Sequence, residues 1–353
     1  LLPNVNTLES KIKSLEDTSS TKNDRITINI LYFKEYGDNK CSGSTHIKNG
    51  NSNQFESLYE AIEALNQFIS NNNIKYVSSI DIRLGSGITW VNEVENRNYN
   101  KSPGDLYYSS NPRTQNVGGP ETIITRLAIT GFGQGTSTII GSWLGVVYNL
   151  QLPPEIIIEG NSCDNLQLNC QLILNNFFWQ GNFGLNVVYS QYDNPNIKPP
   201  HHPKLPSENV NYFDCSTNYY NIKSATSDNI TTFTERRKVE VIITNMWVQL
   251  NFPNKDIETS LQFPLFFLNI PVLNSFFMTQ TNMTSYIKPE SYAKTYGTCV
   301  FFSQFVQGNP TDTFIQTCSF STRIFGEENY KCLGIINNDK VSILNSQFNT
   351  KQL

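Results

Sequence analysis

ILNNFF at residues 173–178, VLNSFF at 272–277 and ILNSQF at 343–348 are three versions of one pattern. Each has two aliphatic residues, an asparagine, two variable residues and an aromatic residue. Asparagine is the non-glycine residue that best tolerates the left-handed backbone region. An apolar strand, an asparagine at a sharp corner and a second apolar strand are what each coil of a stacked structure needs. The pattern therefore predicts a parallel β-helix, in which every coil buries its inward side chains on the coils above and below.

The spacing of the pattern tests this interpretation. Thr317 and Thr244 stand at the corner position of two related stretches, IQTCSF at 315–320 and IITNMW at 242–247. The intervals from Thr317 to Asn345 and from Thr244 to Asn274 predict coils of about 28 residues joined by loops of variable length. The interval from 274 to 317 is longer, so we expect a long loop or a degenerate coil there. Asn175, Asn274 and Asn345 are the expected structural turn residues.

The composition is that of an all-β domain with an uncharged polar surface. Charged residues make up 16% of the chain, against about 25% in typical globular chains. Neutral side chains suit a stacked β-structure, where ladders of like charges would repel each other. The net charge of −4 indicates no binding of nucleic acid. No apolar run is as long as the roughly 18 residues that indicate a membrane span, so we expect no membrane insertion.

Residues 1–18 have the spacing of a coiled coil. Apolar residues recur at intervals of four and three, which places them at the a and d positions of about two heptads. They are Leu1, Val5, Leu8, Ile12 and Leu15. Two heptads are too short to be stable alone, so the segment is interpreted as the end of a stalk. An amphipathic helix folded back on the body is the alternative. Residues 19–54 are expected to be a linker and a leading strand, and residues 55–353 the β-helix body.

A helix is predicted at about residues 55–70, at the start of the body. Ser57, followed three residues on by Glu60, has the spacing of a capping box. Apolar residues then recur at helical spacing over FESLYEAIEAL at residues 55–65. A strand with the sequence IDIRLGSG follows at residues 80–87 and ends in glycines.

This segment resembles the beginning of pectate-lyase-like right-handed β-helix proteins, which are common in phage tailspikes and viral fibres. In those proteins a helix of the type Phe-x-Ser/Thr-Leu-x-x-Ala-Ile-x-x-Leu caps the first coil, and a strand of the type Ile-x-Ile-x-Leu-x-x-Gly follows it. Residues 129–133 (ITGFG) and 138–141 (TIIG) are similar to the first coils of such proteins. The resemblance implies a single-stranded right-handed parallel β-helix. Together with the coiled coil, it also implies a homotrimer with other virion proteins at its N-terminal stalk.

The resemblance leads to three functional expectations. The first is a structural protein of a virus, either a phage or a large DNA virus, that mediates attachment to a host surface through a glycan or receptor. It would be displayed on the virion surface after assembly in the host cytoplasm. The second is a polysaccharide depolymerase on the same scaffold, a glycoside hydrolase or a lyase. The third is a purely structural capsid or surface component. The sequence favours a protein that is not an enzyme.

No local motif identifies a catalytic site, a cofactor site or a metal site. Carboxylates on or beside the expected strands are scattered, and each is interpreted as a surface group. They are Glu155, Glu159, Asp164, Asp193, Asp214 and Glu240. The seven cysteines contain no CxxC pair and are expected to be free thiols in the core. The loop at residues 131–136, GFGQGT, lacks the lysine of a phosphate loop and is predicted to be a tight turn.

Tyrosines in the predicted loops are the best candidates for ligand contacts. A tyrosine combines an apolar ring with a hydroxyl group, and both suit a sugar or a protein partner. Surface tyrosines without a ligand, or packing between subunits, are the alternative. The candidates are Tyr99, Tyr107, Tyr108, Tyr192, Tyr212 and Tyr219.

Overall fold

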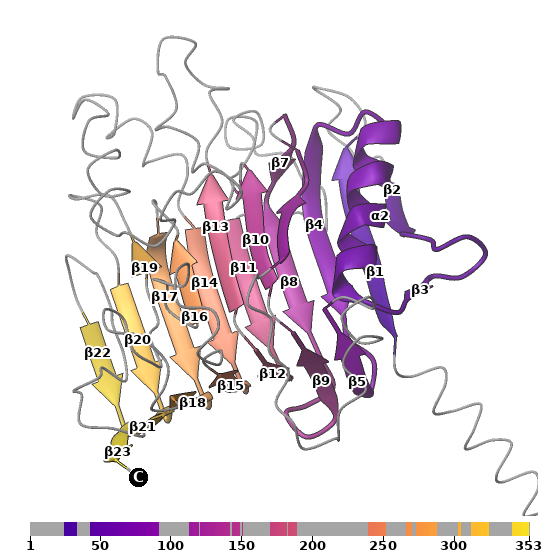
Figure 1. Ribbon diagram of the computed structural model, residues 1–353. Coiled ribbons are helices and arrows are strands. Elements are labelled where there is room, and N and C mark those ends of the chain that lie inside the picture. Colours follow the sequence, from indigo (N-terminus) through magenta and orange to yellow (C-terminus); the bar gives the residue numbers. More distant parts are fainter. Residues whose placement is uncertain are drawn as a thin grey trace, which may run out of the picture.

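The described part of the chain consists mostly of parallel β-strands and contains one helix (Figure 1). This structure is a computed structural model. It describes residues 25–33, 43–91, 113–119, 121–141, 143–148, 150, 170–181, 183–188, 239–251, 266–269, 273–287, 303–304, 312–324 and 341–352. The predicted coiled coil at residues 1–18 and part of the 19–54 linker lie outside these residues. The all-β prediction is confirmed.

Within the described residues, the strands form three sheets, and the strand numbers that follow refer to this part of the chain. Sheet 1 has eleven strands: β1 (Ile26–Phe33), β2 (Gly43–His46), β3 (Gln54–Phe55), β4 (Tyr76–Arg83), β7 (Ile123–Ile124), β8 (Arg126–Thr130), β11 (Cys170–Asn175), β14 (Val239–Thr244), β17 (Leu273–Thr279), β20 (Asp312–Gln316) and β22 (Val341–Leu344). Sheet 2 has seven: β5 (Gly87–Trp90), β9 (Ser137–Ile140), β12 (Phe178–Gln180), β15 (Trp247–Asn251), β18 (Asn282–Ile287), β21 (Ser319–Ile324) and β23 (Gln347–Gln352). Sheet 3 has five: β6 (Arg113–Val117), β10 (Trp143–Tyr148), β13 (Phe183–Val188), β16 (Phe266–Asn269) and β19 (Ser303–Gln304).

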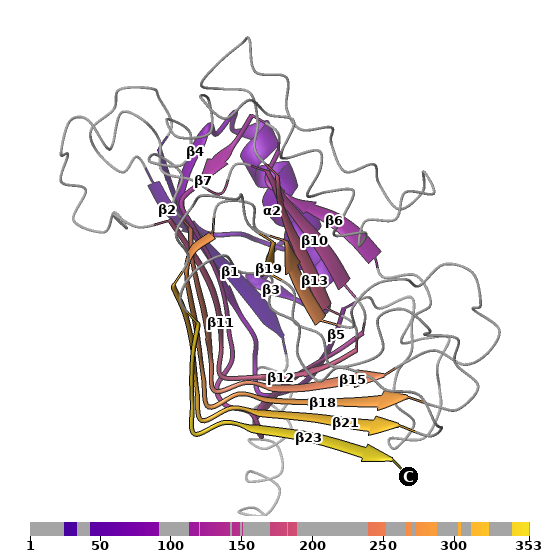
Figure 2. The same ribbon diagram turned by 90° about the vertical axis from the view of Figure 1, so that its left-hand side faces the viewer.

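The chain passes through the sheets in a fixed order. We call one complete turn of the chain through the sheets a coil. Each coil adds one strand to sheet 1 and then one strand to sheet 2. In the first five coils the described part also includes a strand of sheet 3, before the chain returns to sheet 1. Every strand of a coil pairs in parallel with the equivalent strand of the next coil. Figure 2 shows sheets 1 and 2 meeting at a sharp corner, with sheet 3 on the opposite side.

Strict alternation of buried and partly exposed residues directs the apolar side chains into the space between the sheets. In β11, Cys170, Leu172 and Leu174 are buried, and the residues between them face outward. β14 repeats this alternation in register with β11, because Leu172 is paired with Val241 and Leu174 with Ile243. The inward residues of all three sheets belong to one core. Each coil therefore buries its apolar residues on the equivalent residues of its neighbours.

The corner between sheets 1 and 2 is a column of residues in the left-handed backbone region. Its positive φ angles are 60° at Asn176, 50° at Asn245, 49° at Gln280, 54° at Thr317 and 49° at Asn345. A left-handed residue turns the chain sharply enough for the residue that follows it to point back into the core. In one pair of coils the side chains also form a ladder, because the Asn245 amide donates a 2.6 Å hydrogen bond to Asn176.

This column corrects two of the three predicted turn residues. Asn345 lies at the corner as expected, but Asn175 is the last residue of β11 and the corner follows it. Asn274 lies inside β17, at a register shift where Val239 pairs with Leu273 and Glu240 pairs with Ser275. The corner of that coil comes at Gln280, after the buried residues Phe276 and Met278 of the strand.

The coil length varies more than the sequence predicts. Successive corners lie at residues 176, 245, 280, 317 and 345, so the longest interval is more than twice the shortest. Only the last interval, from 317 to 345, has the expected length. Of the two alternatives for residues 274 to 317, a long loop or a degenerate coil, the degenerate coil is excluded, because β17 pairs directly with β20.

Glycines build the second corner, between sheets 2 and 3. Gly141 and Gly181 have φ angles of 130° and 131°. A Cβ atom added at Gly181 would lie 2.2 Å from the carbonyl oxygen of Gly141. The close approach of these two coils therefore requires that residue 181 has no side chain.

The helix α2 (Leu58–Asn71) covers the core at the β1 end of the stack (Figure 1). It buries Leu58, Ala61, Ile62, Leu65 and Ile69, and contacts β1, β3 and β6. The Ser57 hydroxyl accepts a 3.2 Å hydrogen bond from the backbone N–H of Glu60. This confirms the predicted cap.

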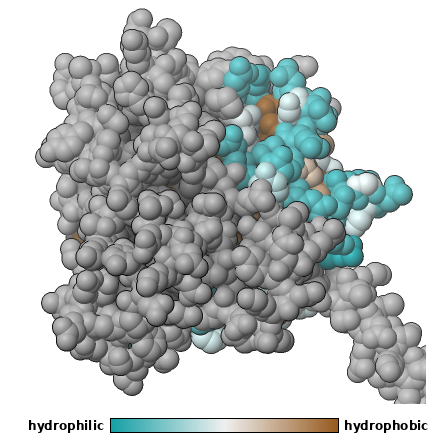
Figure 3. Space-filling model, viewed as in Figure 1, coloured by the Kyte–Doolittle hydropathy of each residue, from teal (hydrophilic) through white to brown (hydrophobic). Residues whose placement is uncertain are grey.

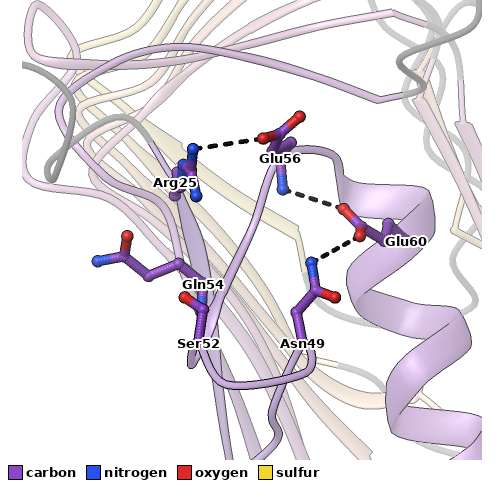
Figure 4. A network of polar contacts seen from close by, with 6 residues as sticks. All are labelled: Arg25, Asn49, Ser52, Gln54, Glu56 and Glu60. Atoms are coloured by element: carbon purple, nitrogen blue, oxygen red, sulfur yellow. Dashed lines mark hydrogen bonds and ion pairs between the residues drawn. The ribbon is translucent and has the colours of Figure 1, made fainter.

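Neighbouring residues hold the beginning of α2 in place (Figure 4). The Glu60 carboxylate accepts hydrogen bonds from the Glu56 backbone N–H at 3.1 Å and from the Asn49 amide at 2.8 Å. The Glu56 carboxylate lies 3.3 Å from the Arg25 guanidinium, at the start of β1. β1 pairs antiparallel with both β4 and β2. The helix covers the core at this end, and the β1–β2 hairpin extends sheet 1 past β4, so that β2 is the edge strand of the described sheet.

Replacing Thr317 by asparagine is expected to stabilise the coil that contains β20. A β-branched residue is poorly suited to a φ of 54°, and asparagine should recover about 1 kcal/mol of this strain. Hydrogen exchange of the β20 and β22 amides should therefore slow about fivefold. Thr284→Asn, in the ordinary strand β18, is the control and should give no gain. If both substitutions slowed hydrogen exchange equally, the inference that Thr317 is strained would be wrong.

Truncating a side chain of the central core is expected to be severely destabilising. Trp179 is fully buried, pairs with Ile139 and Val248 on the neighbouring coils, and has its ring centroid 4.8 Å from that of Phe183. Trp179→Ala should lower the free energy of unfolding by about 3–5 kcal/mol, measured by guanidinium denaturation and circular dichroism. Phe132, 75% exposed, is the control: its alanine variant should stay within about 0.5 kcal/mol of the parent. A small effect at Trp179 would contradict a close-packed core.

Candidate ligand-binding face

The sequence-predicted contact residues fall outside the part of the chain that the structure describes. This holds for Tyr99, Tyr107, Tyr108, Tyr192, Tyr212 and Tyr219, and for five of the six candidate carboxylates. Among the six candidate carboxylates, the structure describes only Glu240. It lies on the outward side of β14, where its carboxylate accepts a 3.0 Å hydrogen bond from the Gln171 amide of the neighbouring coil. Its observed contact therefore joins two coils.

Other described carboxylates also have structural partners. Asp81 forms an ion pair with Arg126 across neighbouring strands of sheet 1. Glu121 pairs with Lys75, and the hydrogen bond and positive charge of Lys75 lower the pKa of the Glu121 carboxyl group. Within the described ranges, no group of three or more histidine, cysteine or acidic side chains is placed to hold a metal ion. No helix of the described part is long and apolar enough to cross a membrane.

The outward side of sheet 2 carries the most distinctive set of exposed side chains. Two of its outward columns lie nearest the corner with sheet 1, as the register defines them, and the column after them has Tyr286, Arg323 and Lys351 at its register positions. We call the residues of the two nearest columns the aromatic face: Ile88, Thr138, Phe178, Trp247, Asn282, Ser319 and Gln347 in one column, and Trp90, Ile140, Gln180, Gln249, Thr284, Ser321 and Asn349 in the other. Every side chain in these two columns is uncharged.

The centre of the aromatic face is a stacked pair of rings. Phe178 of β12 and Trp247 of β15 have ring centroids 4.7 Å apart and planes 21° apart. Trp247 remains 43% exposed. The stack follows from the fold, because the two residues stand at the same register position of neighbouring parallel strands, shortly after their corners. Rings held this way present a rigid apolar surface at a low cost in side-chain entropy.

Residues on either side of the stack differ in polarity. Towards β5 the outward residues include Ile88, Trp90 and Ile140, whereas towards β23 they are amides and hydroxyls such as Asn282, Ser319 and Gln347. Strands are about 4.8 Å apart, so the seven strands of sheet 2 span about 29 Å. The aromatic face therefore offers a row of evenly spaced hydrogen-bonding groups beside an apolar surface. Sequence reasoning missed it because the stack depends on the exact register of distant coils.

Sheet 1 carries a comparable outward stack. Phe277 and Phe314 have ring centroids 5.3 Å apart and planes 5° apart, and Phe277 is 37% exposed. Their column continues through Ile242 and Ile173, which are partly buried. From Ile173 to Phe314 the column is aliphatic and aromatic, and its next register positions are Ser342 of β22 and Ala128 of β8.

A polar groove lies beside α2, where the exposed surface is mostly hydrophilic (Figure 3). Its volume is about 630 Å³. Several of its polar groups bind each other: the Asn66 side chain donates to the Asn116 carbonyl and accepts from the Gly118 N–H, and the Gln115 amide donates to the Tyr59 carbonyl. These contacts fasten the helix to β6, so the groove is a structural junction.

Comparison with known proteins finds no matching family model, no matching curated protein and no matching solved structure.

The described cysteines are core residues. Cys170 and Cys318 are both buried and unpaired. Burial, together with the negative charge of Glu240, raises the pKa of the Cys170 thiol well above its ordinary value, and burial also raises the pKa of Cys318. The thiolate is the reactive form, so neither residue is placed to act as a nucleophile.

Alkylation tests the burial of these thiols. At pH 8, iodoacetamide should modify Cys170 and Cys318 at least about a hundredfold more slowly in the native protein than in guanidinium, because reaction requires local opening. Mass spectrometry of the separate peptides gives both rates. A cysteine introduced by Asn282→Cys, at an exposed position of the aromatic face, should react as fast as an unfolded thiol. Rapid native modification of Cys170 would contradict its place in the core.

Proposed function

We propose that this chain is a right-handed parallel β-helix that serves as the body of a viral fibre or spike. Its function would be attachment to a host surface through a linear glycan bound on the aromatic face. The β-helix is supported by the fixed order in which the chain visits three parallel sheets. The right hand is supported by the strong preference of parallel crossover connections for that hand. The viral setting rests on the resemblance of residues 55–141 to tailspike proteins.

The stack of the partly buried Phe178 on the exposed Trp247 is the observation that carries glycan binding. A sugar ring has an apolar C–H face that packs on an aromatic ring, and hydroxyl groups at its edge that bond to amides and hydroxyls. The aromatic face supplies both chemistries side by side. Because its polar groups repeat from strand to strand, they match a polymer with repeating units better than a compact ligand. Neutral side chains favour an uncharged glycan.

The proposed assembly is a homotrimer held by a coiled coil at residues 1–18, with other virion proteins at that stalk. Three copies of a weak site on a rigid body gain avidity without any new contact, provided that all three reach the same surface. The protein would act on the virion surface after assembly in the host cytoplasm.

Alanine substitutions in the two stacks test the site. The full chain is incubated with a panel of soluble neutral polysaccharides, and affinity is measured by biolayer interferometry. Trp247→Ala and Phe178→Ala should each weaken binding at least about tenfold, the loss expected for about 1.4 kcal/mol of contact free energy. Phe277→Ala is the matched control, because it removes one ring of a similarly exposed stack on sheet 1, and it should leave the affinity unchanged.

Two outcomes would overturn the proposal. Equal losses in all three variants, with unchanged circular dichroism, would mean that the aromatic face is not the site. Release of oligosaccharides from a bound polysaccharide, detected as new reducing ends, would replace attachment with depolymerase activity.

A further inference from the structure

The two rings of the aromatic face stand one behind the other along the stack of strands. The planes of Phe178 and Trp247 differ by 21° and their centroids are 4.7 Å apart. Two nearly parallel rings come this close only when one covers a face of the other. Because the residues pair on neighbouring strands, each ring turns one face to its partner and the opposite face along the stack. A ligand lying flat on sheet 2 would therefore meet ring edges rather than ring faces.

The accessible ring face of this pair belongs to Trp247 and looks towards β18. Trp247 is 43% exposed, whereas Phe178 is partly buried. The next residue of the same column is Asn282 on β18, which is exposed, and Ser319 on β21 follows it. Neighbouring strands are about 4.8 Å apart, which matches the spacing of stacked rings. The place that a third ring of the stack would take therefore lies over the exposed side chain of Asn282.

Polar side chains around this place are available to a ligand. On sheet 1 an outward polar group bonds to the neighbouring coil, as the Gln171 amide does to Glu240. By contrast, no hydrogen bond within the described ranges involves the side chains of Asn282, Gln249 or Thr284. Gln249 and Thr284 belong to the second column of the aromatic face, beside the same place. Their amide and hydroxyl groups can both donate to and accept from the edge of a ligand.

We propose that one sugar ring of the glycan stands edge-on over Asn282, with its apolar C–H face stacked on Trp247. The inference rests on the proposed function and specifies how the sugar binds. The ligand class is a neutral hexopyranose, whose hydroxyl groups bond to Asn282, Gln249 and Thr284. Phe178 does not touch the sugar in this arrangement. It is a positioning residue, because its ring supports the other face of Trp247.

A sugar ring that lies flat on sheet 2 is the alternative arrangement. It would cover the outward side chains of several strands, so an additional aromatic residue in the column would enlarge its contact surface. An aromatic side chain at residue 282 would instead fill the place of an edge-on sugar. The two arrangements therefore predict opposite effects of the same substitution.

Substitutions of Asn282 test the edge-on arrangement. The probes are a soluble β-glucan and a soluble galactomannan, both neutral, and the affinity of the full-length protein is measured by biolayer interferometry. Asn282→Ala should weaken binding about fivefold, the loss expected for one hydrogen bond. Asn282→Phe should weaken it at least about fiftyfold, because the new ring also removes the stacking contact of the sugar. Ser342→Phe is the matched control: it extends the Phe277–Phe314 stack of sheet 1 by one ring and should leave the affinity unchanged.

The positioning role of Phe178 has its own test. Phe178→Tyr keeps a ring against Trp247 and should retain the parent affinity, whereas Phe178→Ala loses it. Equal losses in both variants would mean that the ring of Phe178 does not act by supporting Trp247.

The outcomes separate this inference from the proposed function. Unchanged or tighter binding by Asn282→Phe, with weaker binding by Trp247→Ala, would overturn the edge-on arrangement and leave the proposed function intact. Unchanged binding by Trp247→Ala, or no binding of either polymer by the parent, would overturn both. Hydrogen exchange of the β15 and β18 amides shows whether Asn282→Phe is folded. If it is not, Asn282→Leu fills the same place with a smaller side chain and should weaken binding at least about tenfold; unchanged binding would overturn the inference.

Discussion

The register between neighbouring coils is the constraint on which the rest of the structure depends. Each strand pairs in parallel with its equivalents, so like positions lie on top of one another through the whole stack. A shift of one residue in a single coil would place its inward set on the outward side. The left-handed corner residues fix this register, since they determine which residue after the corner first points inward. The inward columns, the aromatic stacks and the amide ladder are all consequences of it.

The sequence allowed the all-β class to be predicted, but not the register of every coil. At residues 343–348 the asparagine is both the recurring feature of the pattern and the left-handed corner. At 173–178 two asparagines are adjacent, and the alternation of buried residues puts the corner at Asn176. At 272–277 the pattern is a coincidence, because a bulge at Asn274 moves the strand and glutamine takes the corner. Local residue preferences cannot detect such a shift, which is decided by packing between coils.

The cap helix was more predictable than the candidate site. Helix capping and helical periodicity are local, and the expected residues Ser57 and Glu60 make the expected contact. The antiparallel pairing of β1 with β4 was not predicted, because alternation does not distinguish parallel from antiparallel partners. The aromatic face was missed for a related reason. Phe178 and Trp247 are far apart in the sequence, and only the register of β12 and β15 brings them together.

The variable spacing of the corners separates the length of a connection from the geometry of the stack. The chain from Asn175 to Val239 is more than twice as long as the chain from Gln316 to Val341. Even so, β11 and β14 pair along their whole length without a shift. The entropic cost of closing a loop grows only slowly with its length. Evolution can therefore lengthen, replace or delete these connections in steps while the stack stays intact. A fold of this kind therefore keeps the geometry of the stack independent of the length of the connections between its strands.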